Sequence, residues 1–312
     1  MNNFKRPMLC ASLLRPNQEH TNEVILAAME RLYKLIPGPR IVTLKEDGIR
    51  GVRLNDLYSR TIKLIPNRSI RARSIVLPAG MDVELCSHTL QYYQTESIVM
   101  SREHADSDLI QFYAIDWFKD KPYIDRLIDI GRLEIPGLYK PLWHWAKDAN
   151  ELMLLFLEAE QNNGEGICWR LPNSPYIQKN TIDNRSTLIE QYLIKLARYV
   201  RQEVIVLGLY EQMENGNESS YNALGAMDRS SCKANKLGKN TLGGFHVKSL
   251  STGLEFDVGT GVGLTDRLRK EIWLNQDKFI GTTRVVKHKA CGQKVLPRSP
   301  IDCGPRKKID II

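Results

Sequence analysis

Short runs of β-branched and aromatic residues recur along the whole chain, and helical patterns interrupt them mostly before residue 200. Apolar residues at helical spacing predict helices at 21–36, 122–131 and 149–162. Compact apolar runs predict strands at 41–44, 109–118 and 165–170. This mixture of strands and helices predicts an α+β fold.

The second part of the chain is predicted to be mostly β. Strand-like runs begin at 203–210 and continue to 289, with one helical pattern at 264–276. A length of 312 residues fits two ordinary domains. We therefore expect a larger α+β domain at 1–200 and a small β-barrel-like domain at 201–312. Within the second domain, residues 213–242 are rich in Gly, Asn and Ser and predict a long flexible excursion.

Charge indicates the kind of partner. Lys and Arg total 44 against 36 acidic residues, which gives a net charge of +8 and favours polyanionic partners. The six cysteines form no C-x-x-C pair, and the six histidines show no ligand spacing with them, so a zinc site has little support. Scattered cysteines, the lack of an N-terminal signal-like run and the lack of a membrane-length apolar stretch predict a cytoplasmic monomer with no membrane partner.

The most informative segment for chemistry is Thr43-Leu44-Lys45-Glu46-Asp47-Gly48-Ile49-Arg50-Gly51. Its lysine stands where a strand ends, and its glycine permits a tight turn directly afterwards. A lysine acts as a nucleophile only when its amine is neutral, and nearby cations or a metal ion would lower its pKa. Taken alone, the segment is equally compatible with a charged surface turn.

This segment resembles motif I of the covalent nucleotidyltransferases, the family of ATP-dependent DNA ligases, RNA ligases and capping enzymes. Segments similar to the remaining family motifs follow in order. They are Ser59-Arg60-Thr61, Asp82-Val83-Glu84-Leu85, Phe112 to Asp116, Tyr123 to Arg126, Glu165 to Arg170, Leu193-Ile194-Lys195, Gly259 to Gly261, Arg298-Ser299-Pro300 and Gly304-Pro305-Arg306.

The resemblance, which is greatest to compact viral and phage DNA ligases, implies a fold and an activity. The fold is a nucleotidyltransferase (adenylation) domain of packed antiparallel sheets and helices, followed by an oligonucleotide-binding (OB) β-barrel with a DNA-clasping loop. The activity is ATP-dependent sealing of 5′-phosphate/3′-hydroxyl nicks in duplex DNA, through a lysyl-AMP and then a DNA-adenylate, in bacterial or phage-infected host cytoplasm. The expected cofactors are ATP and Mg²⁺, with Mn²⁺ as a substitute.

The resemblance also implies residue roles. Lys45 is the expected nucleophile, and Arg60 is expected to hold the 5′-phosphate of the nick. Expected nucleotide contacts are Thr43, Arg50, Arg60, Glu84, Ile115, Lys195, Arg298 and Arg306. Expected metal ligands are Asp47, Glu84 and Glu165. Expected DNA contacts are Arg60, Lys233, Lys236 and Lys239.

Three positions depart from the family pattern. Ala197 stands where a second lysine is usual, Ile115 where an aromatic residue stacks on adenine, and Val83 where glycine is usual. Two alternatives therefore stay open: an RNA ligase or capping-type enzyme, and a nucleic-acid-binding relative without activity. Asp116 is equally compatible with a functional acid and with a structural one.

Overall fold

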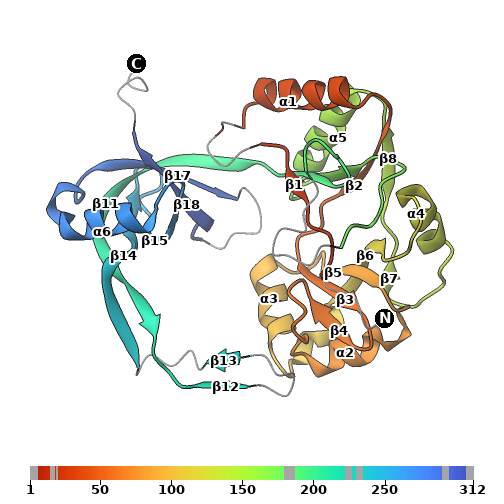
Figure 1. The fold of residues 1–312 in the computed structure, drawn as a ribbon, viewed down its shortest axis with the longest axis horizontal. Helices are drawn as coiled ribbons and strands as arrows, with labels where there is room; N and C mark the ends of the chain where they lie inside the picture. The colour runs from red at the N-terminus through yellow and green to blue at the C-terminus, as the bar shows by residue number, and fades with distance from the viewer. Residues whose placement is uncertain are drawn as a thin grey trace. The chain divides into compact units, whose positions relative to one another are not determined.

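The computed structural model describes residues 6–14, 18, 20–178, 187–221, 227–229, 235–289 and 295–306. These residues form two compact units, one ending at Arg198 and the other beginning at Tyr199, and each is described by itself. Figure 1 labels their helices and strands. No helix in the described ranges is both long enough and apolar enough to cross a membrane.

The first unit contains the three helices that periodicity predicts. They are α1 (Asn22–Leu35), α4 (Tyr123–Gly131) and α5 (Ala149–Gln161). It also contains further helical segments that apolar spacing did not indicate, since each has few buried positions. These are α2 (Arg68–Arg73), α3 (Tyr92–Met100) and the 3₁₀ turns η1 (Ser74–Val76) and η2 (Ala105–Leu109).

One sheet of this unit lies against α1 and α5. Val42, Trp169 and Ile194 point from the sheet into a core that they share with Ile25 and Phe156 of the two helices. Strand residues between these apolar positions therefore point away from the helices. The strand order is β1 (Ala11–Ser12), β10 (Ile194–Leu196), β9 (Ile167–Arg170), β2 (Arg40–Leu44) and β8 (Trp143–Ala146).

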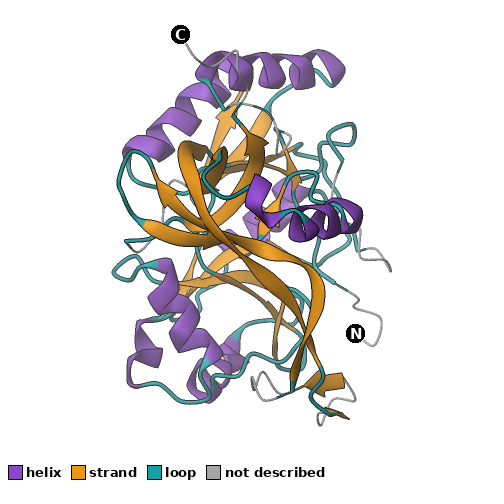
Figure 2. Cartoon of the chain, turned by 90° about the vertical axis from the view of Figure 1, so that its left-hand side faces the viewer, coloured by secondary structure: helices purple, strands orange, loops and turns teal. Residues whose placement is uncertain are grey.

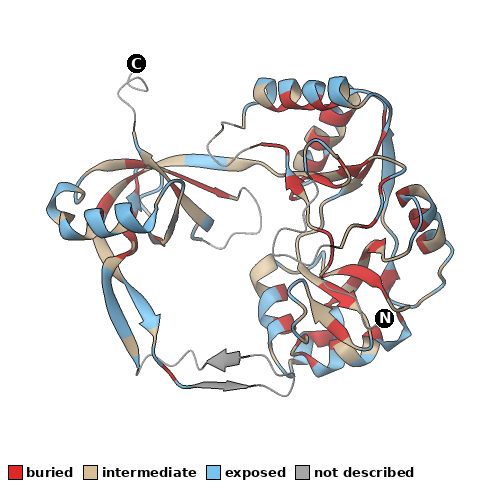
Figure 3. Cartoon of the chain, viewed as in Figure 1, coloured by how far each residue is buried: buried red, intermediate tan, exposed pale blue. Residues whose placement is uncertain are grey.

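A second sheet of the first unit has its own core. Val83, Leu85 and Phe112 pack there against Ile70 and Ile98 of the short helices. Figure 3 shows the buried strands of this sheet in red, next to helices with exposed outer faces. The strand order is β4 (Leu57–Ser59), β3 (Ile49–Arg53), β5 (Met81–Cys86), β6 (Gln111–Trp117) and β7 (Leu138–Tyr139).

The core of the second unit is built, among its described residues, on a six-stranded sheet and the helix α6 (Asp266–Leu274), which the 3₁₀ turn η3 (Gln276–Lys278) follows. Phe245, Val204 and Val286 form its core with Ile272 of the helix. The α+β fold class predicted for the whole chain is confirmed. The strand order is β15 (Glu255–Val258), β14 (Lys236–Ser249), β11 (Tyr199–Asn215), β17 (Thr283–Lys289), β18 (Arg298–Pro305) and β16 (Thr260–Gly261).

The described residues of the excursion expected at 213–242 lie mostly in paired strands. Strands β11 and β14 stay paired out to Asn215 opposite Lys236, and β12 (Ser219–Tyr221) pairs with β13 (Met227–Arg229) beyond them. Figure 2 shows the long paired strands as a twisted ribbon. A ribbon with polar residues on both faces carries no apolar alternation, so periodicity did not reveal it.

Candidate active site

Lys45 leaves the end of β2 on the face opposite the helices. Because Val42 points into the helix-covered core, alternation directs Thr43 and then Lys45 to the other side. The backbone N–H of Lys45 donates to the carbonyl of Gly166 at 2.9 Å. Gly166 has φ of 144°, and a Cβ there would lie 2.1 Å from the Leu196 carbonyl oxygen. Glycine at this position therefore permits the close approach of the strand ends beside Lys45.

The side chain of Lys45 is paired with Glu165. Its Nζ donates a short hydrogen bond to Oε2 of the carboxylate, whose side chain is 2% exposed, against 21% for the lysine. Burial lowers the pKa of Lys45, but the neighbouring Glu165 and Glu84 carboxylates outweigh burial, and the pKa rises above its ordinary value. Glu165 and Glu84 therefore favour the protonated amine, and the lowering of its pKa by nearby cations and a metal ion stays a prediction.

Glu84 lies on the second sheet at a position that also faces the lysine. In register it stands opposite Arg50 on β3 and Tyr113 on β6. Burial raises its pKa to about 7, and the negative charge of Glu165 adds to the increase, whereas Lys45 opposes it. The pKa effects show that Lys45, Glu84 and Glu165 sense one another's charges, so the two sheets of the first unit contribute to one polar centre.

Arg50 is held by a carboxylate that the sequence did not single out for this role. Its Nε donates to Oδ1 of Asp82 at 2.8 Å, and its Nη1 donates to the Met8 carbonyl at 2.8 Å. The Tyr176 hydroxyl donates to Oδ2 of the same aspartate at 2.7 Å. Asp82 is fully buried, so it fixes the direction of the guanidinium group.

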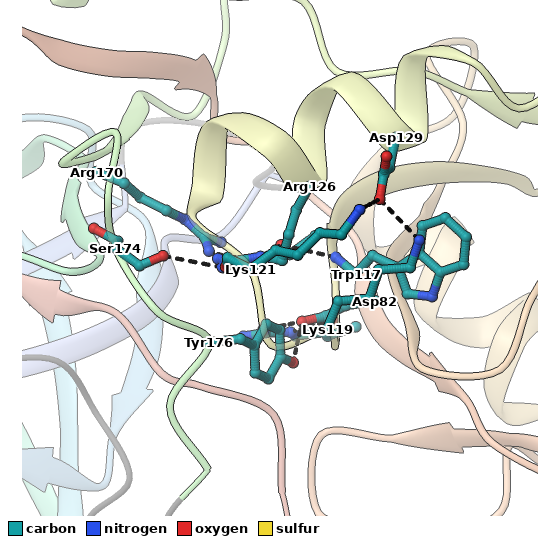
Figure 4. Close-up of polar contacts among 11 residues, drawn as sticks. Asp82, Trp117, Lys119, Lys121, Arg126, Asp129, Arg170, Ser174 and Tyr176 are labelled. Atoms are coloured by element: carbon teal, nitrogen blue, oxygen red, sulfur yellow. Dashed lines mark hydrogen bonds and ion pairs between the residues drawn. The ribbon is translucent and has the colours of Figure 1, made fainter.

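Asp116 is a structural acid. Its carboxylate is fully buried and accepts hydrogen bonds from Arg126 at 2.7 and 3.1 Å and from Arg170 through a further short contact. Arg126 also donates to the Ser174 carbonyl at 3.0 Å. Figure 4 shows these arginines between α4 and the strand residues. The pairing ties α4 to β6 and β9. Of the two roles that the sequence left open for Asp116, these contacts favour the structural one.

Five more predicted nucleotide or metal residues lie in the first unit. Lys195, Cys168 and Thr43 stand side by side across β10, β9 and β2, on the face that Lys45 shares. Ile115 is half-buried at a β-bulge, because Val83 pairs with Ala114 and Asp82 with Asp116. Arg60 is exposed in the turn after β4, and Asp47 is half-buried in the loop after Lys45.

The three carboxylates expected to bind metal do not form one tight group. Among the described residues, the set of His, Cys, Asp and Glu ligand atoms that gather within 4.8 Å is a different one: Glu46, Cys86 and His88. Glu84 lies on β5, and Glu165 lies just before β9 of the other sheet. The sequence analysis did not identify Cys86 and His88 as potential ligands. The third member of their group, Glu46, lies 40 positions before Cys86 in the chain.

The remaining predicted residues belong to the second unit. Arg298 opens β18 opposite Lys289, and Arg306 pairs with Glu203 at 3.0 Å. Lys236 begins β14, and Lys239 is exposed farther along it. Lys233 lies outside the described residues.

Known proteins resemble this chain in structure rather than in sequence. No protein-family model matches the chain, and no curated protein matches it by sequence. A solved structure of a Lig E DNA ligase aligns with 86% of this chain and 92% of its own, at TM-score 0.63 and 19% identity. The Chlorella virus DNA ligase-adenylate aligns with 98% of this chain and 99% of its own, at TM-score 0.50 and 23% identity. The chain therefore has the fold of compact DNA ligases.

Proposed function

We propose that this chain is an ATP-dependent DNA ligase that seals nicks through a covalent adenylate on Lys45. The observation that carries the proposal is the position of this amine at the end of β2, in contact with Glu165 and beside Glu84. The fold is one in which DNA ligases have been solved, and the motif resemblance places the nucleophile at the same lysine.

The residues around Lys45 suit a nucleotide and a divalent cation. Lys195 and Arg50 supply positive charge for phosphate groups, and Thr43 lies on the same face as Lys195. Glu165 is buried and Glu84 is half-buried, and their carboxylates offer oxygen donors, which suits a hard cation such as Mg²⁺. Such a cation, when bound, neutralises charge on the triphosphate, and we include Asp47 as a further ligand.

The proposed reaction has three transfers. Lys45 loses its proton, for which Glu165 is the carboxylate in contact, and its Nζ then bonds to the α-phosphorus of ATP as the bond to pyrophosphate breaks. The adenylyl group then passes to the 5′-phosphate of a nick, which Arg60 is suited to hold. Finally the 3′-hydroxyl displaces AMP and the phosphodiester bond forms.

The second unit is proposed to grip duplex DNA without reading its sequence. Its β11–β14 ribbon carries Lys236 and Lys239, and we add Lys233 on the basis of sequence alone. Lysines at such positions neutralise phosphates and fix the register on the duplex. Arg298 and Arg306 are proposed to contact the nucleotide during the first transfer. We also propose that the protein acts as a monomer.

The test is transfer of label from α-labelled ATP to the protein in the presence of Mg²⁺, followed by a chase with nicked DNA. Wild type is expected to become labelled and to release the label as AMP while the nick is sealed. Lys45→Ala is expected to remain unlabelled. Equal labelling of the two proteins would remove Lys45 from the reaction.

The same assay separates the alternatives. Labelling by GTP in place of ATP would indicate a capping-type enzyme, and sealing of RNA nicks alone would indicate an RNA ligase. A wild-type protein that binds nicked DNA but accepts no label from ATP would indicate a binding relative without activity. Mass spectrometry of the labelled protein then identifies the modified residue.

A further inference from the structure

A second cluster of potential ligands lies beside the proposed nucleophile and takes no part in the reaction above. Glu46 follows Lys45 in the chain, Cys86 ends β5, and His88 stands two residues later. One ligand atom of each lies within 4.8 Å of the other two. Nε2 of His88 and Oε2 of Glu46 are 3.1 Å apart, so two of the three already touch.

The neighbouring residues hold these side chains in place. The His88 ring packs on Tyr113 with centroids 4.7 Å apart, and Tyr113 stacks on Tyr139 at the same distance. The loop that carries Glu46 lies directly on β5, because a Cβ on Gly48 would come within 2.7 Å of the Cys86 Cβ. The cluster is therefore positioned by the sheet and its aromatic neighbours.

We propose that Glu46, Cys86 and His88 bind a transition-metal ion of the zinc class, with a fourth position open to water. One thiolate, one imidazole and one carboxylate are ligands that Zn²⁺ accepts in three-residue sites. The thiolate and the carboxylate together balance the charge of a divalent ion. Tetrahedral bonds of about 2.0–2.3 Å place ligand atoms roughly 3.3–3.8 Å apart. The His88 and Glu46 atoms, 3.1 Å apart, are already close to this range, and any separation near the 4.8 Å upper limit would shorten by about 1 Å on binding.

A cysteine beside a histidine and a carboxylate also occurs in enzymes whose nucleophile is the cysteine. The surroundings of Cys86 argue against that role. Its side chain is buried, at 2% exposure for the residue. An activated nucleophile needs the opposite environment. A buried thiol loses its proton when a metal ion binds to the sulfur in place of that proton.

This site is distinct in chemistry from the magnesium site proposed at Glu84 and Glu165. Sulfur and nitrogen ligands select softer ions, whereas Mg²⁺ requires oxygen. A bound ion would link Glu46 to β5 and so restrain the loop that begins at Lys45. The inference does not depend on ligase activity, because metal binding is measured directly.

The experiment is a titration of the metal-free, reduced full-length protein with Co²⁺, followed by absorption spectroscopy. Wild type is expected to bind one equivalent, with the visible bands of a tetrahedral ion and a thiolate-to-cobalt charge-transfer band in the near ultraviolet. Zn²⁺ is expected to displace it and abolish the spectrum. Cys86→Ser is expected to lose the charge-transfer band, and His88→Ala and Glu46→Gln to weaken binding at least 10-fold.

Two matched controls isolate the site. His246→Ala removes a histidine that likewise pairs with a carboxylate, Asp257, and Cys303→Ser removes another cysteine. Both are expected to leave the cobalt spectrum unchanged. Because His88 has a side chain that is 65% exposed, His88→Ala tests the proposal even if Cys86→Ser fails to fold. A charge-transfer band that is absent from wild type, or unchanged in a folded His88→Ala protein, would overturn the proposal.

Discussion

Nζ of Lys45 donates a hydrogen bond to Oε2 of Glu165, a carboxylate that is almost completely shielded from solvent. Their partnership makes the proposed nucleophile a structural residue as well. Removing one member of a buried ion pair leaves the other without compensation, and this costs stability. The stability and the labelling of Lys45 variants therefore have to be measured separately.

Lys45→Arg is expected to keep the charge opposite Glu165 while removing the amine that forms the adenylate. Labelling by ATP should fall by at least 10³-fold with little loss of stability. Lys45→Ala should lose labelling equally and also lose about 1–3 kcal/mol of unfolding free energy, because Glu165 stays buried without its partner. Labelling assays and urea denaturation of both variants measure the two effects. Substantial labelling of Lys45→Arg would contradict the assignment.

Gly166→Ala is expected to disturb the active site through the backbone. The left-handed φ of 144° and a Cβ position 2.1 Å from the Leu196 carbonyl make any side chain strained there. We expect a loss of more than 2 kcal/mol in unfolding free energy, and labelling that falls at least 10-fold. Gly131→Ala is the control, because nothing lies within 4 Å of its Cβ position at the end of α4. It should leave labelling intact.

Asp116→Asn is expected to be strongly destabilising although the side chain keeps its shape. Two buried guanidinium groups, of Arg126 and Arg170, would lose their counter-charge. Loss of one partner from such a cluster costs about 3–5 kcal/mol. Urea denaturation should show this, whereas Asp120→Asn at an exposed position should change stability by less than about 0.5 kcal/mol. Equal stabilities of the two variants would argue against the structural role of Asp116.

Acid should remove the contribution of Asp116 to stability. Burial raises the pKa of this carboxyl, but Arg170 and Arg126 outweigh burial and hold the pKa below its ordinary value. The native state therefore favours the charged form, so the contribution is present above about pH 4, the unfolded value. It decreases as the pH falls toward the folded-state pKa. The stability difference between wild type and Asp116→Asn should shrink over this range, and a difference independent of pH would contradict the argument.

Lys236→Gln with Lys239→Gln is expected to weaken binding of nicked DNA without affecting adenylation. Each lost phosphate contact should reduce the slope of log K against log salt concentration by about 0.9. Binding measured at several salt concentrations gives this slope. Lys248→Gln, at another position on β14 where the lysine pairs with Glu255, serves as the control. An unchanged slope in the double variant would exclude the ribbon lysines from the DNA contact.

Local residue patterns were sufficient to predict much of the fold. The spacing of apolar residues located α1, α4 and α5, since an amphipathic helix has to bury one face wherever it packs. Apolar runs located β2 and β6, since a strand also has to bury its apolar side chains. The segment around Lys45 also drew attention to this lysine, and its resemblance to motif I of the covalent nucleotidyltransferases implied the role of nucleophile.

Contacts between distant residues were decided by the tertiary structure alone. Glu165 meets Lys45 across 120 positions, and its negative charge raises the pKa of the lysine. Asp82 and Tyr176 converge on Arg50 in the same way, and Glu46 reaches Cys86 and His88 only because its loop lies on β5. Sequence patterns determine which face of an element is apolar. The charges that surround a side chain depend on which elements pack together, and this sets its pKa and its ligands.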